Sequence, residues 1–427
     1  MKIKNLIIIF LLSACTPLVQ SSTNPGSDTK ILRNIDYAYE DQIKTIIIRP
    51  AIDDPQSYML PAVTQLGQWN LMLEFDDLRT ERNNYYARIE HCNRDWSKSM
   101  LQDLDFMNAF NEFALTDFEF SVDTHIPYTH YRFSLPPVKL PGNYLVVVYR
   151  GSDKQDIILS KRFMVYDNRV SFENERNLIG AGSMASLNQQ INFTLSYKNL
   201  EIINPMENIN VSIRQNQRWD NIASDVRPSF IREVDKQLEY RFFDDAKMFK
   251  GGNEFRFFDL RSLISPGRNV ASVNKTVKPF EVYIEKDKSK SNQAYSQLPD
   301  YNGNFIPQNL DYNDENFSNY ANINFTLAAK RLSGEVYVTG KFTHWNLTSE
   351  NLMQYDSLHQ EYHAKILLKQ GWYDYQYYVK SKNLPPYFLE GSHFETENAY
   401  EILVYYRALQ PRADLLIGYI KLEKNQR

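Results

Sequence analysis

The chain has 427 residues, of which 43% are apolar, and its 48 lysines and arginines against 52 acidic residues give a formal net charge of −4. At roughly 100–200 residues per domain, this length predicts two to three domains with buried cores, and the composition excludes a disordered chain. Nearly balanced charge supplies no basic field for a phosphate backbone, so we expect no nucleic-acid partner. Aromatic residues make up 14% of the chain, which favours β-structure because rings suit a pleated, half-buried surface.

The N-terminus carries a targeting signal. Two lysines precede an apolar run over residues 6–12, which is too short to cross a hydrocarbon core of ~30 Å and is typical of a signal peptide. The run ends in Leu12-Ser13-Ala14-Cys15, which resembles the bacterial lipobox, where cleavage precedes the cysteine and its thiol receives diacylglycerol. We therefore expect residues 1–14 to be a lipoprotein signal peptide and Cys15 to be lipidated. The alternative is an ordinary secretory signal with a chance cysteine.

Residues 15–30 are polar and rich in serine, proline and glycine, which predicts a flexible tether. A tether of this length has a reach of about 20 Å, so the folded body would stay near the membrane. Lipoproteins exported to the cell surface in the Bacteroidota carry an acidic run after the cysteine, and this chain has none. We expect an anchor in the outer membrane facing the periplasm, with the cell surface as the alternative.

Short strand patterns separated by turn residues follow, and they predict a first β-sandwich over residues 31–168. Its run Tyr144–Tyr149 is apolar enough for a central strand that is buried on both faces. A second sandwich is predicted over 169–286, where Ile209, Val211 and Ile213 alternate with polar residues. Residues 287–300 are polar and without periodicity, as expected of a linker.

A third domain is predicted over residues 301–427. Its strands flank Gly340-Lys341-Phe342-Thr343-His344-Trp345-Asn346, an order that resembles the early-set immunoglobulin-like domains. The predicted fold class is therefore all-β, with three consecutive immunoglobulin-like or early-set sandwich domains after a lipoprotein signal peptide. No long amphipathic helix is evident, although residues 99–113 could form one or two helical turns.

The sequence offers no assembled catalytic constellation. Cys92 is the one thiol besides Cys15, and adjacent strand residues point to opposite faces, so His91 is a poor base for it. A buried structural role is the favoured reading for Cys92, with a reactive nucleophile as the alternative.

Three further groups could hold a metal ion. The pair His359 and His363 has a helical spacing without the glutamate that a zinc motif requires. The group Asp123, His125 and His130 and the pair Asp76-Asp77 fit strand ends and turns better than cation sites. We predict no enzyme activity, no metal and no cofactor.

Read together, the motifs resemble the plug proteins of the type IX secretion system, a family of Bacteroidota lipoproteins formerly described as a domain of unknown function. The matching segments follow one another in order and cover most of the mature chain: Leu73–Leu78, His91–Ser99, Tyr128–Tyr131, Gly142–Tyr144, Arg162–Tyr166, Gln215–Asp220 and Gly252–Asp259.

The resemblance implies a periplasmic β-domain protein that caps the periplasmic mouth of the giant outer-membrane β-barrel translocon. The barrel would be its partner, and occlusion of the pore in the absence of cargo would be its mechanism, with no covalent step. The family's contact residues cannot be carried over, because motif residues such as Trp96 and Trp219 fit turns and core corners equally well.

The alternative function is an outer-membrane lipoprotein with a carbohydrate-binding module. The segment around Trp345 resembles the loop of glycogen-binding modules, whose tryptophan ring stacks on a sugar face. Such sites need a second aromatic residue after the later hairpin, and Tyr387 is the approximate substitute. If the chain is instead a plug protein, this third domain is a structural or protein-contact relative of those modules.

Overall fold

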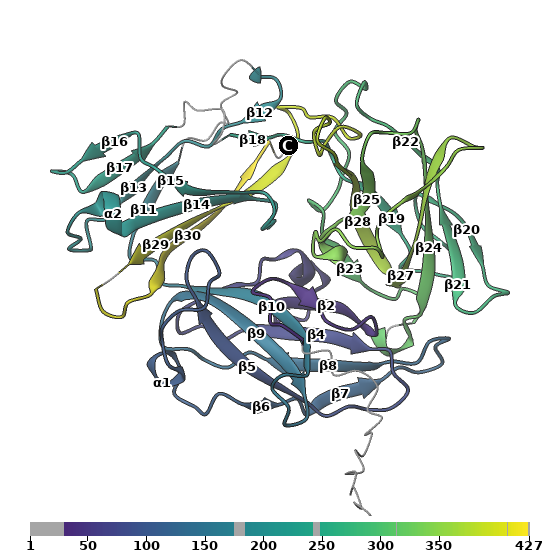
Figure 1. The fold of residues 1–427 in the computed structure, drawn as a ribbon, viewed down its shortest axis with the longest axis horizontal. Coiled ribbons are helices and arrows are strands. Elements are labelled where there is room, and N and C mark those ends of the chain that lie inside the picture. The colour runs from purple at the N-terminus through teal and green to yellow at the C-terminus, as the bar shows by residue number, and fades with distance from the viewer. Residues whose placement is uncertain (1–29, 175–183, 242–247, 313, 408, 426–427) are drawn as a thin grey trace, which may run out of the picture.

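The strands pair into three β-sandwich units that meet around a common centre (Figure 1). The computed structural model describes residues 30–174, 184–241, 248–312, 314–407 and 409–425. The predicted all-β class is confirmed, and no helix within these ranges is long and apolar enough to span a membrane.

The first unit packs two sheets face to face, and its strands run from Tyr37 to Tyr166. One sheet has the order β1 (Tyr37–Ala38), β10 (Ile157–Tyr166), β9 (Gly142–Arg150), β5 (Tyr85–Cys92) and β6 (Phe113–Ala114), with β3 (Val63–Gln65) on β10. The other has the order β2 (Ile43–Pro50), β4 (Leu71–Asp77), β8 (Thr129–Ser134) and β7 (Asp117–Phe120). The short helices are η1 (Pro55–Met59) and α1 (Asp103–Phe106), and α1 falls in the segment predicted to be helical.

Strand β9 is central to its sheet, as its apolar run predicted. It pairs with β10 on one side and β5 on the other, and residues 142–149 are all buried. A strand with sheet neighbours on both edges and packing on both faces needs apolar residues throughout, which explains why the run does not alternate.

The second unit joins segments that lie far apart in the chain. One sheet has the order β11 (Ser171–Asn174), β13 (Phe193–Ser196), β17 (Gln237–Tyr240) and β16 (Phe230–Arg232). The other has the order β15 (Ile222–Val226), β14 (Ile209–Gln215), β29 (Asn398–Arg407) and β30 (Asp414–Lys424). The pair β12 (Asn188–Gln189) and β18 (Phe249–Lys250) and the helix α2 (Pro205–Asn208) complete it.

The third unit also has two sheets. One has the order β20 (Val270–Asn274), β21 (Phe280–Ile284), β24 (Tyr320–Ala328), β27 (Glu361–Lys369) and β26 (Gln354–Asp356). The other has the order β19 (Arg256–Asp259), β28 (Gly371–Lys380) and β23 (Phe305–Pro307). Strand β22 (Asp287–Lys288) pairs with β24, and β25 (Glu335–Thr339) pairs with β28. The 3₁₀ helices are η4 (Glu315–Phe317) and η5 (Lys341–Thr343).

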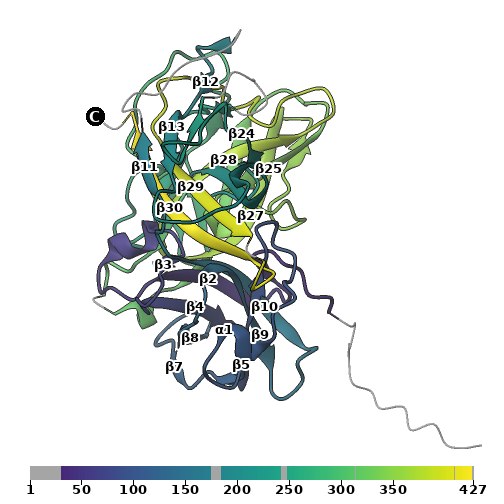
Figure 2. The same cartoon turned by 90° about the vertical axis from the view of Figure 1, so that its left-hand side faces the viewer.

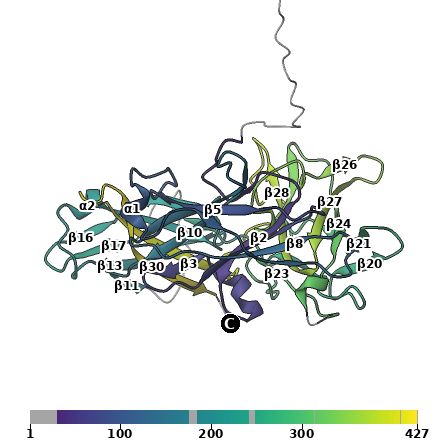
Figure 3. The same ribbon diagram turned by 90° about the horizontal axis from the view of Figure 1, so that it is seen from below.

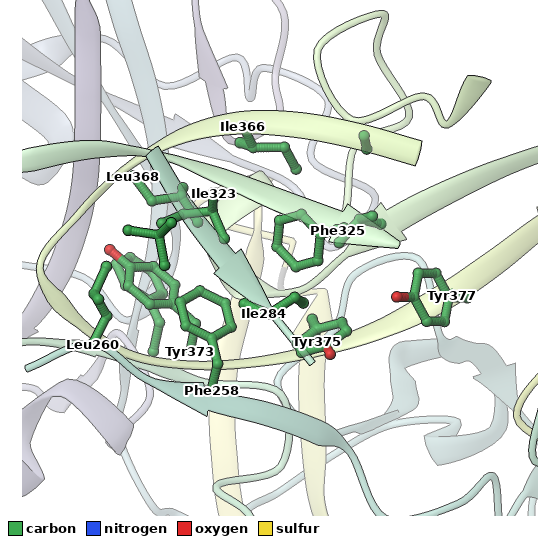
Figure 4. Close-up of a cluster of buried hydrophobic side chains, with 14 of the residues drawn as sticks. Phe258, Leu260, Ile284, Ile323, Phe325, Ile366, Leu368, Tyr373, Tyr375 and Tyr377 are labelled. Atoms are coloured by element: carbon green, nitrogen blue, oxygen red, sulfur yellow. The ribbon is translucent and has the colours of Figure 1, made fainter. Parts of the chain in front are cut away.

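The core of the third unit is rich in aromatic side chains (Figure 4). Phe258 of β19 stacks on Tyr373 of β28, with ring centroids 5.2 Å apart, and meets the edge of Phe325 from β24 at 5.9 Å. Such pairs add to the free energy gained by burying the rings, so they lock the two sheets together.

Strand pairing crosses the predicted boundary between the second and third domains. The hairpin β29–β30 falls in the predicted third domain, yet β29 pairs along its length with β14 of the second unit. Conversely, β19, β20 and β21 fall in the predicted second domain and pair within the third unit, and β22 lies in the predicted linker. Residues 169–286 and 301–427 therefore do not coincide with the sheets, because strands far apart in the chain pair in a register that no local pattern specifies.

The hairpin β29–β30 also joins the second unit to the first. Leu403, Tyr405 and Leu416 pack with Cys92 and Leu145 of the first unit in one buried cluster. Figure 2 shows this hairpin reaching down to β10, and Figure 3, seen from below, places β16 and β26 at opposite ends of the molecule.

Candidate functional site

Two tryptophans from the family-like motifs meet where the first and second units touch. Trp96 follows β5 and Trp219 follows β14, and their rings lie edge to face with centroids 4.7 Å apart. The guanidinium of Arg162 lies 5.3 Å from the Trp96 ring and 5.0 Å from the Trp219 ring, and Arg214 lies 4.2 Å from Trp219. Arg214 forms a bidentate, buried ion pair with Glu401 of β29, at 2.5 and 2.8 Å. Cation–π and aromatic contacts of this kind join the two units.

A buried carboxylate joins the first and third units. Asp76 of β4 accepts hydrogen bonds from Lys369 of β27 at 2.9 Å and from the hydroxyl of Tyr320 at 2.6 Å, and its other oxygen lies 2.7 Å from Nδ1 of His130. Burial favours the protonated acid, but the charge of Lys369 and the bond to His130 hold the pKa of Asp76 well below its usual value. Asp76 is therefore an ionised link between units rather than half of a calcium site with Asp77. Asp77 instead accepts a hydrogen bond from the hydroxyl of Tyr85 at 2.7 Å.

The segment 340–346, which would bind sugar under the carbohydrate-binding alternative, lies at the junction of all three units. Nζ of Lys341, in η5, donates to the carbonyl of Tyr58 in the first unit at 3.1 Å, to Oε1 of Gln217 in the second at 3.3 Å, and to Oδ1 of Asn304 in the third at 2.7 Å. When it is protonated, this amino group has three N–H donors, enough for one hydrogen bond to each unit. Burial and the nearby charge of Lys161 lower the pKa of Lys341 to about 7.

Asp36 forms ion pairs with two basic side chains of the same junction, Lys161 and Arg162. Its carboxylate lies 3.3 Å from Nζ of Lys161 and accepts the backbone N–H of Arg162 at 2.8 Å. Nζ of Lys161 also lies 3.1 Å from Nδ1 of His344. Burial and the charge of Lys161 lower the pKa of His344 to about 3. The cavity between these groups measures about 60 Å³, which is room for ordered water but not for a sugar or a nucleotide.

Trp345 lies against protein rather than facing solvent with an open ring. The guanidinium of Arg218 lies 4.0 Å from its ring centroid, and the ring of Phe255 lies 5.9 Å away. Tyr387 lines a different cavity, and Lys250 lies 6.0 Å from its ring. The structure does not bring Trp345 and Tyr387 into one groove.

The side chains of His91 and Cys92 point to opposite faces of the sheet, as predicted, and their neighbours show this. The His91 ring contacts Phe106 and Tyr144 inside the first sandwich, whereas Cys92 packs on the other face of the sheet, against the second unit. Burial raises the pKa of the Cys92 thiol to about 12, and burial lowers the pKa of His91 to about 4. A protonated thiol is a poor nucleophile, so this pair is not set up for catalysis.

The remaining histidines are placed apart. His125 packs on the ring of Phe280, 4.0 Å away, while His130 binds Asp76. His359 lies in the turn before β27 and binds Asp356, and His363 lies in the strand itself, so their helical spacing is not realised. Within the described ranges, no cluster of three or more metal-binding side chains is present. Cys15, the predicted lipidation site, lies outside the described residues.

The fold and the junction define a class: an all-β protein of three sandwich units held together by buried ion pairs and tryptophan contacts. Comparison with known families is more specific. Residues 43–167 match the family described as type 9 secretion system plug protein 1st domain, which confirms the predicted resemblance over this segment.

One solved structure is similar over almost the whole chain. It is the crystal structure of a hypothetical protein from Parabacteroides merdae ATCC 43184, with a TM-score of 0.84 and 28% sequence identity. The match covers 92% of this chain and 100% of that chain, so the arrangement of the three units is common to both. No curated protein matches this chain.

The junction was only partly visible in the sequence. Trp96, Trp219 and Asp76 stand in the family-like motifs, but nothing in the sequence pairs Asp76 with Lys369. Lys341 stands in the loop segment around Trp345, but no sequence pattern assigned it a contact of its own. The signal that could have suggested a buried basic residue is the position of Lys341 itself, between Gly340 and Phe342 in a short connection between two strands.

Proposed function

We propose that this chain is a non-enzymatic plug that caps the periplasmic mouth of the giant outer-membrane β-barrel translocon of the type IX secretion system. It would seal the pore by steric occlusion when no cargo is present, and cargo would displace it. The observation that carries this proposal is the family match over residues 43–167.

The contacts between the units support the mechanical part of the proposal. A plug must resist deformation, because a pore wide enough for folded cargo stays open if the body that covers it yields. Lys341, Asp76 and the Trp96–Trp219 pair tie each unit to the others through buried groups, which are costly to separate. Such contacts favour one rigid body over three independently moving domains.

We further propose that Cys15 carries the lipid that holds the plug on the periplasmic face of the outer membrane. A protein confined to the membrane of its barrel partner rebinds from a high effective concentration. Two or three acyl chains anchor a protein stably, whereas one chain binds reversibly.

Affinity purification tests the proposal. A tag after Arg427 is added, the envelope is solubilised gently, and the copurifying proteins are identified, with an unrelated tagged outer-membrane lipoprotein as the control. We expect the giant barrel, free of cargo, with the plug and not with the control. Recovery of glycan-handling proteins in its place would overturn the proposal and favour the carbohydrate module.

A further inference from the structure

Four strongly exposed apolar side chains lie in two segments of the first unit. Met100, Leu104 and Phe110 are 80%, 77% and 79% exposed; Leu104 lies in the short helix α1, labelled in Figure 1, and the other two lie just before and just after it in the chain. Ile31, next to the first described residue, is 82% exposed. Single exposed apolar residues are ordinary, and the second unit also exposes Ile203 and Val234, so what distinguishes the group on the first unit is where it lies.

The α1 segment is held firmly by the fold. Phe106 and Met107 are 2% and 1% exposed and belong to the core of the first unit. Met107 forms a β-bridge with Val138, and the backbone N–H of Lys139 donates to the carbonyl of Phe106 at 2.8 Å. The exposed side chains are therefore displayed on a fixed base, because their neighbours are anchored in the core.

The same surface lies beside the point where the tether joins the fold. Lys30 forms an ion pair with Asp156 at 2.5 Å, and Nζ of Lys154 lies 6.0 Å from the ring centroid of Phe110. Asp156 and Lys154 both belong to the turn between β9 and β10. Lys30, the first described residue, and Phe110 therefore flank one turn.

The charges around the patch are mixed. Lys98 is 66% exposed in its side chain and lies 3.6 Å from Glu90, and Lys154 is 50% exposed and lies 2.8 Å from Glu112. Asp103 and Asp105 stand on either side of Leu104 and are both exposed, and Asp105 accepts the backbone N–H of Gln102. Apolar tips flanked by flexible lysines suit the bilayer interface, where the tips enter the acyl boundary and the ammonium groups meet lipid phosphates.

We propose that Ile31, Met100, Leu104 and Phe110 form a membrane-contact surface that rests on the lipid bilayer. The inference rests on the proposed anchor at Cys15, because a tether over residues 15–30 with a reach of about 20 Å keeps its attachment point close to the membrane. The contact fixes the orientation of the plug beside the barrel, with the first unit against the lipid and the other two units projecting away.

Site-specific fluorescence tests this contact. The mature chain, with a hexahistidine tag in place of Cys15, is held on vesicles of phosphatidylethanolamine, phosphatidylglycerol and a nickel-chelating lipid. An environment-sensitive thiol label is placed at Leu104→Cys or, as the matched control, at Leu358→Cys, which is 83% exposed in the third unit. Cys92 stays unlabelled because it is buried and burial raises the pKa of its thiol to about 12.

We expect the label at position 104 to shift to the blue and to be quenched by lipid-borne quenchers, while the label at 358 does neither. The double substitution Met100→Ser and Phe110→Ser should reduce the shift, whereas Ile203→Ser with Val234→Ser, at exposed sites of the second unit, should not. Identical spectra at 104 and 358 would overturn the proposal. The vesicles hold no barrel, so that failure leaves the plug function standing, and a failed copurification leaves this result unaffected.

Discussion

The carboxylate of Asp76 depends on a cation from another unit. Both Asp76 and Lys369 are buried, at 0% and 4% side-chain exposure, and the oxygen–nitrogen distance is 2.9 Å. A buried ion pair adds little net stability over apolar residues, but removing one partner leaves the other as an uncompensated charge. At the residue scale, this pair therefore reports directly on the contact between the first and third units.

Lys369→Met should lower the free energy of unfolding by about 3–5 kcal/mol. The matched control is Lys365→Met on the same strand, whose ion pair with Glu281 has a lysine side chain 55% exposed and should contribute about 0–1 kcal/mol. Urea denaturation at neutral pH measures both. Equal losses in the two variants would contradict the role given to Lys369.

Lys341 should make stability depend on pH. Its folded pKa is lowered to about 7, against about 10.4 in an unfolded chain, so between these values the unfolded state binds a proton that the folded state lacks. The free energy of unfolding then rises with pH over this window. Comparing the wild type with Lys341→Met between pH 7 and about 9 isolates this contribution. We expect a shallower slope in the variant, and parallel slopes would refute the assignment.

Trp345 should behave as a structural residue. Because Arg218 covers its ring at 4.0 Å, a sugar would have to displace that guanidinium to stack there. We expect no retention on immobilised α-glucans, and we expect Trp345→Ala to lower thermal stability. Retention that Trp345→Ala abolishes would instead support the carbohydrate-binding alternative.

At the element scale, the hairpin β29–β30 and the turns that carry Trp96 and Trp219 join the first two units. The hairpin completes the second unit's sheet through β14 and packs on the first unit through Leu403 and Tyr405. The two tryptophans and Arg162 form a second contact beside it. Separating the units would expose both apolar groups at once.

Trp219→Ala should cost about 3 kcal/mol, since it removes a large ring packed between two guanidinium groups and a second tryptophan. Trp69→Ala is the control, because that side chain is 42% exposed and its loss should cost under about 1 kcal/mol. Thermal unfolding of the two variants gives the comparison. A Trp219→Ala protein as stable as the Trp69→Ala protein would rule out the aromatic contact as a determinant of the junction.

Individual strands were predictable, but their partners were not. Alternation placed the strand at Ile209–Ile213, because side chains on a pleated strand point alternately to the two faces, and an unbroken apolar run placed the strand at Tyr144–Tyr149. Pairing of β14 with β29 joins segments separated by more than 180 residues, and no local pattern encodes such a register. The role of Lys341 was hidden for the same reason, since its three acceptors come from three distant segments.

At the scale of the whole molecule, three sandwich units share one buried junction, and the solved structure from Parabacteroides merdae has the same arrangement over 92% of this chain. The polar contacts shared between the units make them resist separate movement, as the proposed plug function requires. The proposed lipid anchor and membrane-contact surface would hold this body beside its barrel in a fixed orientation.

The central claim is that the chain seals an open translocon, and envelope permeability tests it directly. The measurement is entry of an antibiotic too large for ordinary porins, in strains lacking this chain, the barrel, or both. We predict that loss of the chain alone makes the outer membrane leaky, while cargo secretion continues in part, and that deleting the barrel as well restores the barrier. Unchanged entry without the chain, or a leak that persists without the barrel, would contradict the plug function.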